Sequence, residues 1–171
     1  MRTADDATAR ETAPSLRIRS IHTDDAGEVL TLQRAAFVQE AAIYGDVNMP
    51  PLTQTLEELR AELGDNLGCV ALRDHRLVGA ARAVRDKELL LIGRIAIAPD
   101  EQGSGIGSDL LLAVERRGAE AGCHEAELFT GSLSEANLRL YERLGYRETA
   151  RVDQGDGTAQ IFLRKDLTVA P

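Results

Sequence analysis

One short segment constrains the fold of this chain more than any other, because it joins a strand to a helix through a glycine-rich turn. Residues 94–98 read Arg-Ile-Ala-Ile-Ala and predict the end of a buried strand, which Pro99 terminates. The turn that follows has three glycines in five residues, 103–107, directly before helical spacing that begins at Ile106. A strand, a turn and a helix in this order indicate a layered α/β or α+β domain.

The rest of the chain alternates strand and helix patterns with no repeated unit. The predicted strands cover residues 16–20, 69–73, 77–84, 89–98, 125–130, 146–152 and 159–164. The predicted helices, about four, cover residues 24–37, 56–63, 106–121 and 134–144. Gly45, Asn48 and the two prolines that follow break regular structure over residues 44–53. We therefore expect a flexible polar tail at residues 1–14 and a single domain with one mixed sheet at residues 15–168.

Charge and hydropathy limit the partners that this chain can have. Lysine and arginine number 20 against 28 aspartates and glutamates, a net charge of −8, which argues against nucleic acid as a partner. The same charge is compatible with a cationic substrate such as an amine, or it simply keeps the protein soluble. No apolar run approaches the roughly 18 residues of a membrane span, and the N-terminus has no apolar stretch typical of a secretory signal.

The cysteines and histidines indicate neither a disulfide nor a metal. Cys69 and Cys123 lie in apolar segments and form no CxxC pair, so we expect two buried free thiols and a cytoplasmic protein. His22, His75 and His124 are isolated from one another, with no partner at metal-ligand spacing. We expect no metal cofactor. The oligomeric state is left open, a homodimer included.

The glycine-rich turn is suited to binding an anion such as a pyrophosphate. Glycines let the backbone approach a ligand closely, and the first turn of a helix offers unpaired N–H groups with a partial positive charge. A plain flexible turn is the simpler alternative. A P-loop is excluded because Gly107 precedes Ser108 and Asp109 instead of a lysine. A dinucleotide-binding fingerprint is excluded because the glycines follow a GxGxG spacing and come late in the sheet.

Two motifs give the chain a family resemblance. Gln102, Gly105 and Gly107 fill the Gln/Arg-x-x-Gly-x-Gly/Ala motif of the Gcn5-related N-acetyltransferases, or GNAT family. Downstream, Asn137 and Tyr141 followed by Leu-Gly-Tyr at 144–146 resemble the second motif of that family. The resemblance covers residues 68–165 well and the N-terminal third only loosely. It implies a V-shaped mixed sheet of about seven strands flanked by about four helices.

The resemblance also implies where acetyl-CoA binds. In this family it enters between two strands that splay apart, which here are residues 89–98 and 125–130. The freed backbone of the first strand would pair with the pantetheine arm, and the loop would hold the pyrophosphate. The implied cofactor-binding residues are Ile95, Ala96, Ile97, Gln102, Gly103, Ser104, Gly105, Ile106, Gly107, Ser108, Asn137 and Tyr141. Ordinary core packing is the alternative for the two isoleucines, and both roles are compatible.

The resemblance implies a catalytic acid but not a clear base. Asn137 and Tyr141 lie four residues apart on one helix face, and the family role of such a tyrosine is to protonate the CoA thiolate. The alternative for Tyr141 is a packed aromatic residue. Some family members carry a glutamate in the middle of the first splayed strand, where this chain has Leu89–Ile92. Glu88 acting through water, or a group from residues 44–46, could serve instead; Glu88 could equally be a solvated turn residue.

The implied function is transfer of an acetyl group from acetyl-CoA to an unidentified amine by direct attack in a ternary complex. No covalent enzyme intermediate is required. The partner would be a small-molecule or peptide amine, recognised by the region around residues 37–56, where family members differ most. Longer acyl groups also remain open. The alternative function is a non-catalytic acyl-CoA-binding sensor or interaction module on the same fold.

Overall fold

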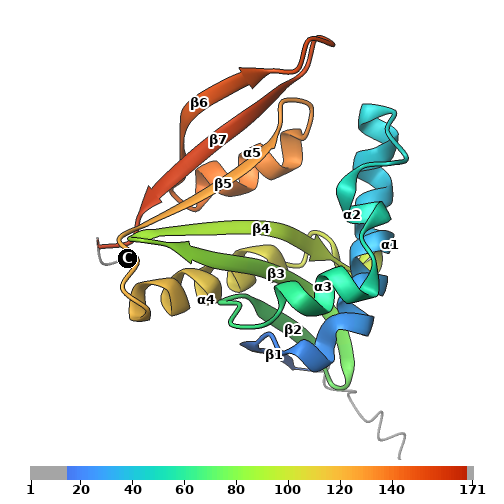
Figure 1. The fold of residues 1–171 in the computed structure, drawn as a ribbon, viewed down its shortest axis with the longest axis vertical. Coiled ribbons are helices and arrows are strands. Elements are labelled where there is room, and N and C mark those ends of the chain that lie inside the picture. Colours follow the sequence, from blue (N-terminus) through green and yellow to red (C-terminus); the bar gives the residue numbers. More distant parts are fainter. Residues whose placement is uncertain (1–14, 169–171) are drawn as a thin grey trace, which may run out of the picture.

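The computed structural model describes residues 15–168, so the predicted tail at residues 1–14 lies outside the described residues. Its centre is a seven-stranded sheet in the order β1-β2-β3-β4-β5-β7-β6 (Figure 1). The strands are β1 Leu16–Ser20, β2 Cys69–Arg73, β3 Arg76–Asp86, β4 Leu89–Ile97, β5 Glu125–Gly131, β6 Arg147–Asp153 and β7 Ala159–Asp166. Only β4 and β5 are parallel, which makes the sheet mixed as the sequence predicted.

The sheet opens into a V between β4 and β5. The two strands pair only through Leu89–Leu91 and Glu125–Glu127, and beyond these residues they diverge (Figure 1). At the closed end, the backbone N–H groups of His124 and Glu125 both donate to the carbonyl oxygen of Glu88, at 2.7 and 3.3 Å. A parallel pair that stops after three residues leaves the facing edges of both strands without a strand partner.

Within residues 15–168, five α-helices flank the sheet, one more than the approximate number predicted. They are α1 Ala26–Tyr44, α2 Pro50–Thr53, α3 Leu56–Glu62, α4 Ile106–Glu120 and α5 Glu135–Arg143, with 3₁₀ turns at Thr23–Asp25 and Pro99–Glu101. The additional helix, α2, lies in the segment expected to be irregular. Pro50 is its first residue, where a proline's fixed φ favours helix and its missing N–H costs nothing.

The helices cover the β2–β4 half of the sheet more fully than the β6–β7 half. Helix α4 packs on β2, β3 and β4, while α1 packs on β3 and β4. Seven consecutive residues of β3, 77–83, are buried, so both faces of that strand are covered. By contrast, every residue of β6 is exposed. The V therefore separates a half of the sheet covered by helices from a more exposed one.

The two cysteines are free thiols in buried positions, as predicted. Cys69 begins β2 and Cys123 precedes β5, and both are almost fully shielded from solvent. Among residues 15–168, no helix is both long enough and apolar enough to cross a membrane.

Candidate functional site

The open edge of β4 offers backbone groups to the gap in the sheet. The N–H of Ala98 donates to the carbonyl oxygen of Val78 on β3 at 2.8 Å. Because backbone N–H and C=O groups of successive strand residues point to opposite sides, those of the residue before Ala98 point away from β3. The backbone of Ile97, and of Ile95 two residues earlier, therefore faces the gap. Ala96 lies between them, pairs with Ala80 of β3 and buries its side chain in the core.

The glycine-rich loop turns the chain from β4 into α4. Gly103 and Gly105 have φ values of 80° and 87°, in the left-handed region that favours glycine. A Cβ added at either residue would meet no protein atom within 4 Å, so it would project into open space. Gly105 caps α4, and the helix's first N–H groups, at residues 106–108, have no partner within the helix. The loop thus presents bare backbone beside an electropositive helix end.

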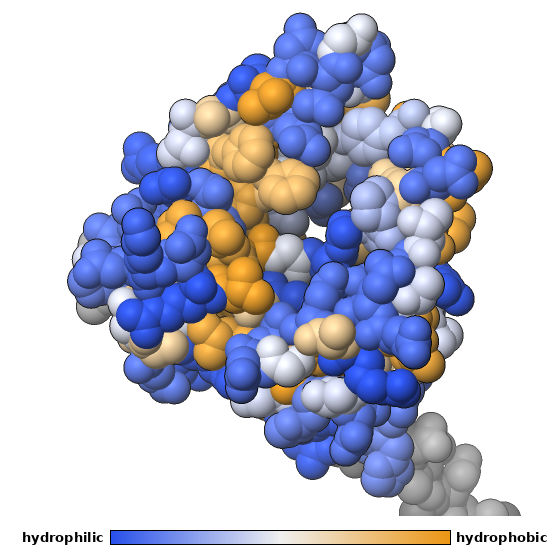
Figure 2. Space-filling view, in the orientation of Figure 1, coloured by the Kyte–Doolittle hydropathy of each residue, from blue (hydrophilic) through white to orange (hydrophobic). Residues whose placement is uncertain are grey.

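Two cavities meet at the V. The loop cavity, about 490 Å³, is lined by the end of β4, the glycine-rich loop, the first turn of α4, and parts of α1 and α5. The strand cavity, about 460 Å³, is lined by the middle of β4, the end of β5, residues 44–51, and the β6–β7 turn. Figure 2 shows the molecule hollowed between the C-terminal strands and the side formed by α1 and α2. Both cavities share the residues Phe37, Glu40, Ile95, Asn137 and Tyr141.

Most of the loop residues that the sequence singled out line the loop cavity. These are Gln102, Gly103, Gly105, Ile106, Gly107 and Ser108. Ser104 differs: its hydroxyl donates to the carbonyl oxygen of Glu101 at 2.6 Å, and it is not among the described residues that line either cavity. Its side chain stabilises the turn instead.

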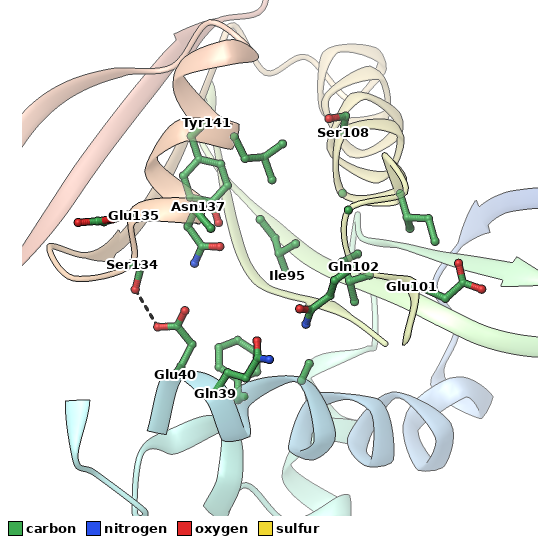
Figure 3. Close-up of a pocket in the computed structure, with 18 of the residues that line it drawn as sticks. Gln39, Glu40, Ile95, Glu101, Gln102, Ser108, Ser134, Glu135, Asn137 and Tyr141 are labelled. Atoms are coloured by element: carbon green, nitrogen blue, oxygen red, sulfur yellow. Dashed lines mark hydrogen bonds between the residues drawn. The ribbon is translucent and has the colours of Figure 1, made fainter. Parts of the chain in front are cut away.

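Tyr141 and Asn137 project from α5 into the junction of the two cavities (Figure 3). The Asn137 amide donates to the Thr130 hydroxyl on β5 at 3.3 Å, which ties α5 to the splayed strand. The Tyr141 ring packs edge-on against Tyr146, with centroids 6.2 Å apart. No described residue forms a hydrogen bond with the Tyr141 hydroxyl. That hydroxyl nevertheless reaches the cavity, because the described part of the chain has no fully buried polar side-chain atom without a partner.

Burial raises the pKa of Tyr141 above its ordinary value of 10, and the nearby Glu40 carboxylate raises it further. Both effects disfavour the charged phenolate. At neutral pH the hydroxyl therefore keeps its proton and can donate it to a group in the junction.

Glu40 is held in the junction by a chain of hydroxyl groups. The Ser134 hydroxyl donates to Glu40 Oε2 at 2.7 Å (Figure 3), and the Tyr44 hydroxyl lies 2.7 Å from Ser134 Oγ. The backbone N–H of Leu133 donates to Tyr44 Oη at 3.1 Å. Tyr44 occupies the space that a Cβ at Gly131 would need, so a glycine is required there. These hydrogen bonds join the end of α1 to the start of α5 across the V.

Sequence reasoning did not single out Glu40. It is one of several acidic residues of α1 and has no local motif. A turn of helix separates it from Phe37 and from Tyr44, the residue that begins the segment considered as a source of a base. Tyr44 and Asp46 of that segment do line the strand cavity. The place of Glu40 in the site is apparent only in the folded structure, where α1 lies opposite α5.

The structure does not bring Glu88 to the junction. It lies in the turn between β3 and β4, at the closed end of the V, and its carboxylate lies 3.2 Å from Nδ1 of His124. Both side chains are more than half exposed. Glu88 is absent from the described residues lining either cavity, which start further along β4, at Ile92.

A family model described as "Acetyltransferase (GNAT) family" matches residues 30–146. UPF0157 protein YqkA of Bacillus subtilis (strain 168) is 26% identical over 132 residues, 76% of this chain. The match covers 37% of that protein, so this chain spans well under half the length of this curated relative.

Solved structures share the fold at low sequence identity. The PaiA N-acetyltransferase from Thermoplasma acidophilum in complex with coenzyme A gives a TM-score of 0.73 at 20% identity, covering 89% of this chain and 99% of that one. The ribosomal-protein-S18-alanine N-acetyltransferase from Escherichia coli gives 0.75 at 18% identity, covering 92% and 97%. YncA, a putative acetyltransferase from Salmonella typhimurium with acetyl-CoA, gives 0.73 at 18%, covering 92% and 98%. These likenesses confirm the predicted fold.

Proposed function

The chain belongs to the GNAT family of acetyltransferases, and from this premise we propose that it transfers an acetyl group from acetyl-CoA to an amine. The acceptor would be a small-molecule or peptide amine, bound at the same time as the donor. Two structural neighbours are named for N-acetylation, one of them of the alanine of ribosomal protein S18, which supports an amine acceptor. The observation that carries the proposal is the pair of cavities meeting at one acidic and one phenolic side chain.

The loop cavity is the proposed binding site of acetyl-CoA. Side chains at Gly103 and Gly105 would fill the space beside the helix end, so bare backbone leaves room for a pyrophosphate. The free N–H groups at residues 106–108 would bind it, and the gap-facing backbone of Ile95 and Ile97 would pair with the pantetheine arm. When bound, the cosubstrate supplies a thioester carbonyl for the amine to attack.

Glu40 is the proposed proton acceptor for the amine. An amine is protonated at neutral pH and must lose a proton before it can act as a nucleophile. Glu40 lines both cavities, and its carboxylate is fixed by Ser134 at one oxygen, which leaves the other free to accept a proton. Its negative charge also attracts a cationic acceptor to the junction.

Tyr141 is the proposed general acid. As the nitrogen–carbon bond forms and the carbon–sulfur bond breaks, its hydroxyl would give a proton to the departing sulfur, and the proton that the nitrogen loses on becoming an amide would pass through solvent and restore the hydroxyl. Its raised pKa keeps that proton available across the neutral range. Asn137, through its hydrogen bond to Thr130, would hold α5 against the splayed end of β5 and so keep Tyr141 in position. Cys69 and Cys123 are buried away from the cavities and take no part.

The test is amine-dependent release of free CoA by the purified full chain. Acetyl-CoA is mixed with a panel of simple amines, amino acids, a peptide with a free N-terminus and an amino sugar, and thiol is detected with and without acceptor. At least one acceptor should raise thiol release well above the hydrolysis control. Thermal stabilisation by acetyl-CoA with no acceptor-dependent release from any class would favour the sensor instead.

A further inference from the structure

The strand cavity contains one positively charged side chain with no protein partner. Its charged lining residues are Glu40, Asp46, Asp156 and Arg94, so Arg94 is the one cation among the described residues there. No hydrogen bond or ion pair joins its guanidinium to any described residue. Glu62 acts on it electrostatically, and burial lowers the pKa of this arginine from its ordinary value. An arginine remains charged at neutral pH even so.

The neighbouring Arg82, unlike Arg94, has hydrogen-bond and ion-pair partners among the described residues. Arg82 on β3 donates to the side chains of Gln33 and Gln54, at 2.7 and 3.3 Å, and lies 3.1 Å from a carboxylate oxygen of Glu62. It is almost fully buried and serves the packing of α1 and α3 against the sheet. Because Glu62 is already paired with Arg82, the charge of Arg94 remains available to a ligand. The two arginines also repel each other, which an anion at Arg94 would relieve.

The backbone at Arg94 is arranged in an unusual way. Ala80 of β3 pairs with Ala96 and Arg82 pairs with Gly93, so two residues of β4 oppose the single residue Ala81. Arg94 is one of the two, and its φ of 52° lies in the region that side chains other than glycine rarely adopt. A bulge of this kind interrupts strand alternation and re-aims a side chain, often beside an active site.

The charge balance of the cavity selects the kind of anion. Three carboxylates and one guanidinium line it, so a doubly charged phosphate would be repelled more than a singly charged carboxylate. The planar guanidinium also matches a carboxylate in two parallel hydrogen bonds. At the other end, Glu40 attracts the ammonium group of the same molecule.

We propose that Arg94 binds a carboxylate of the acceptor, so that the substrate is an amine that also carries a carboxylate, such as an amino acid. This inference rests on the proposed function and adds the substrate class to it. Glu40 and the junction receive the amine, while Arg94 fixes the other end of the molecule. Arg94 is a specificity-determining residue in this account, since it does not contact the reacting atoms.

The first experiment compares acids with their amides as acceptors. CoA release is measured for glycine, L-alanine, β-alanine and L-glutamate, and for glycinamide, L-alaninamide and β-alaninamide. The best acid should exceed its amide by about 10- to 100-fold in kcat/KM, the range expected for hydrogen bonds to a charged group. In Arg94→Gln that preference should collapse to within about threefold. Arg17→Gln is the control and should keep the full preference, because Arg17 is exposed on the edge strand β1.

The second experiment needs no turnover. With CoA present, the melting temperature is measured against N-acetylglycine, N-acetyl-L-alanine and N-acetyl-L-glutamate, and against the carboxamide of each. The acids should stabilise the wild type and the Arg17→Gln control, but not Arg94→Gln, and the amides should stabilise none of them. Equal stabilisation by acids and amides, or by none of these ligands, overturns the carboxylate site. Acid-specific stabilisation without amine-dependent CoA release would keep the carboxylate site and reject the proposed transferase activity.

Discussion

The two cavities are built in different ways. The loop cavity takes its glycine-rich turn and helix end from one continuous segment, residues 95–108, which offers backbone groups, while α1 and α5 line its other side. The strand cavity draws its lining from six separate parts of the chain: α1, the segment after it, β4, β5, α5 and the β6–β7 turn. Backbone recognition suits a ligand that is the same for every member of a family. Side-chain recognition suits a ligand that changes from one member to the next.

Because the loop cavity is the proposed donor site, we expect substitutions in the glycine-rich loop to weaken CoA binding strongly and to leave acceptor binding unchanged. Gly105→Asp places a side chain and a negative charge where the pyrophosphate would bind, and forces aspartate to a φ of 87°. We expect CoA affinity to fall at least about 1,000-fold, since like charges brought together at an interface cost several kcal/mol. Isothermal titration calorimetry measures this directly.

Gly122→Asp is the matched control for the loop variant. Gly122 has a φ of 96° in the turn after α4, away from both cavities, so it reproduces the backbone strain without touching the loop. Both variants should lose about 1–2 kcal/mol of folding stability from the strain. Normal CoA binding by Gly105→Asp would contradict a role of the loop in CoA binding. An equal loss of binding in Gly122→Asp would contradict it too.

At the junction, Tyr141→Phe should separate chemistry from binding. The ring stays packed and only the proton and its hydrogen bond are lost. General acid catalysis contributes about 10²- to 10⁴-fold, or about 3–5 kcal/mol of barrier, and water replacing the phenol favours the lower end. Turnover should fall by that amount in steady-state assays, while CoA affinity changes by less than about threefold.

Tyr146→Phe provides the contrast. Tyr146 packs against Tyr141 but donates its hydroxyl to Glu115 at 3.0 Å in the core, near the ion pair between Glu115 and Lys165. Loss of that hydrogen bond should cost about 1–3 kcal/mol of stability and leave turnover nearly unchanged. If both tyrosine variants lose only stability, Tyr141 is a core residue and not an acid.

On the acceptor side, Glu40→Gln should lower turnover by about 100-fold, because the amide still accepts a hydrogen bond from Ser134 but cannot take a proton. CoA affinity should change little, and the deficit should shrink at high pH, where the amine is already neutral. Glu28→Gln, exposed in the first turn of the same helix, is the control. A deficit independent of pH would argue that Glu40 only shapes the cavity.

The smallest predicted effect concerns alkaline pH. A tyrosine with an ordinary pKa would be half deprotonated at pH 10 and would lose half its activity as an acid. The pKa of Tyr141 is raised by burial and by Glu40, so its proton stays on through that pH. Turnover at saturating substrate should therefore stay constant to within about a fifth between pH 8 and pH 10, instead of falling by half. A clear decline centred below pH 10 would contradict the raised pKa.

The same contrast explains how much could be predicted from the sequence. The loop is proposed to bind through backbone groups, and its glycine spacing with the adjoining strand and helix signals predicted its place in the fold; its pyrophosphate ligand stays a prediction. The V between the two splayed strands was implied by the family resemblance, and the seven strands followed from hydrophobic spacing. Helix α2 was missed because Pro50 and Pro51 break most helices but favour a first turn.

Side chains that meet across the V left no local signal. Glu40 lies in α1, nearly a hundred residues from Ser134, and the two meet only because α1 and α5 face each other. Glu88 was considered because it begins the right strand, but it lies at the closed end, beside His124. Arg94 stands inside the recognisable strand, and its role depends on a bulge that hydrophobic spacing does not reveal.

In the proposed mechanism, donor and acceptor occupy separate cavities and meet at Tyr141. A crystal structure with a bisubstrate analogue, in which CoA sulfur is joined through an acetyl linker to the nitrogen of glycine, tests it most directly. We expect the pyrophosphate at residues 103–108, the linker beside Tyr141 and Asn137, and the glycine in the strand cavity. A pyrophosphate elsewhere, or a glycine directed to solvent with the strand cavity empty, would contradict it.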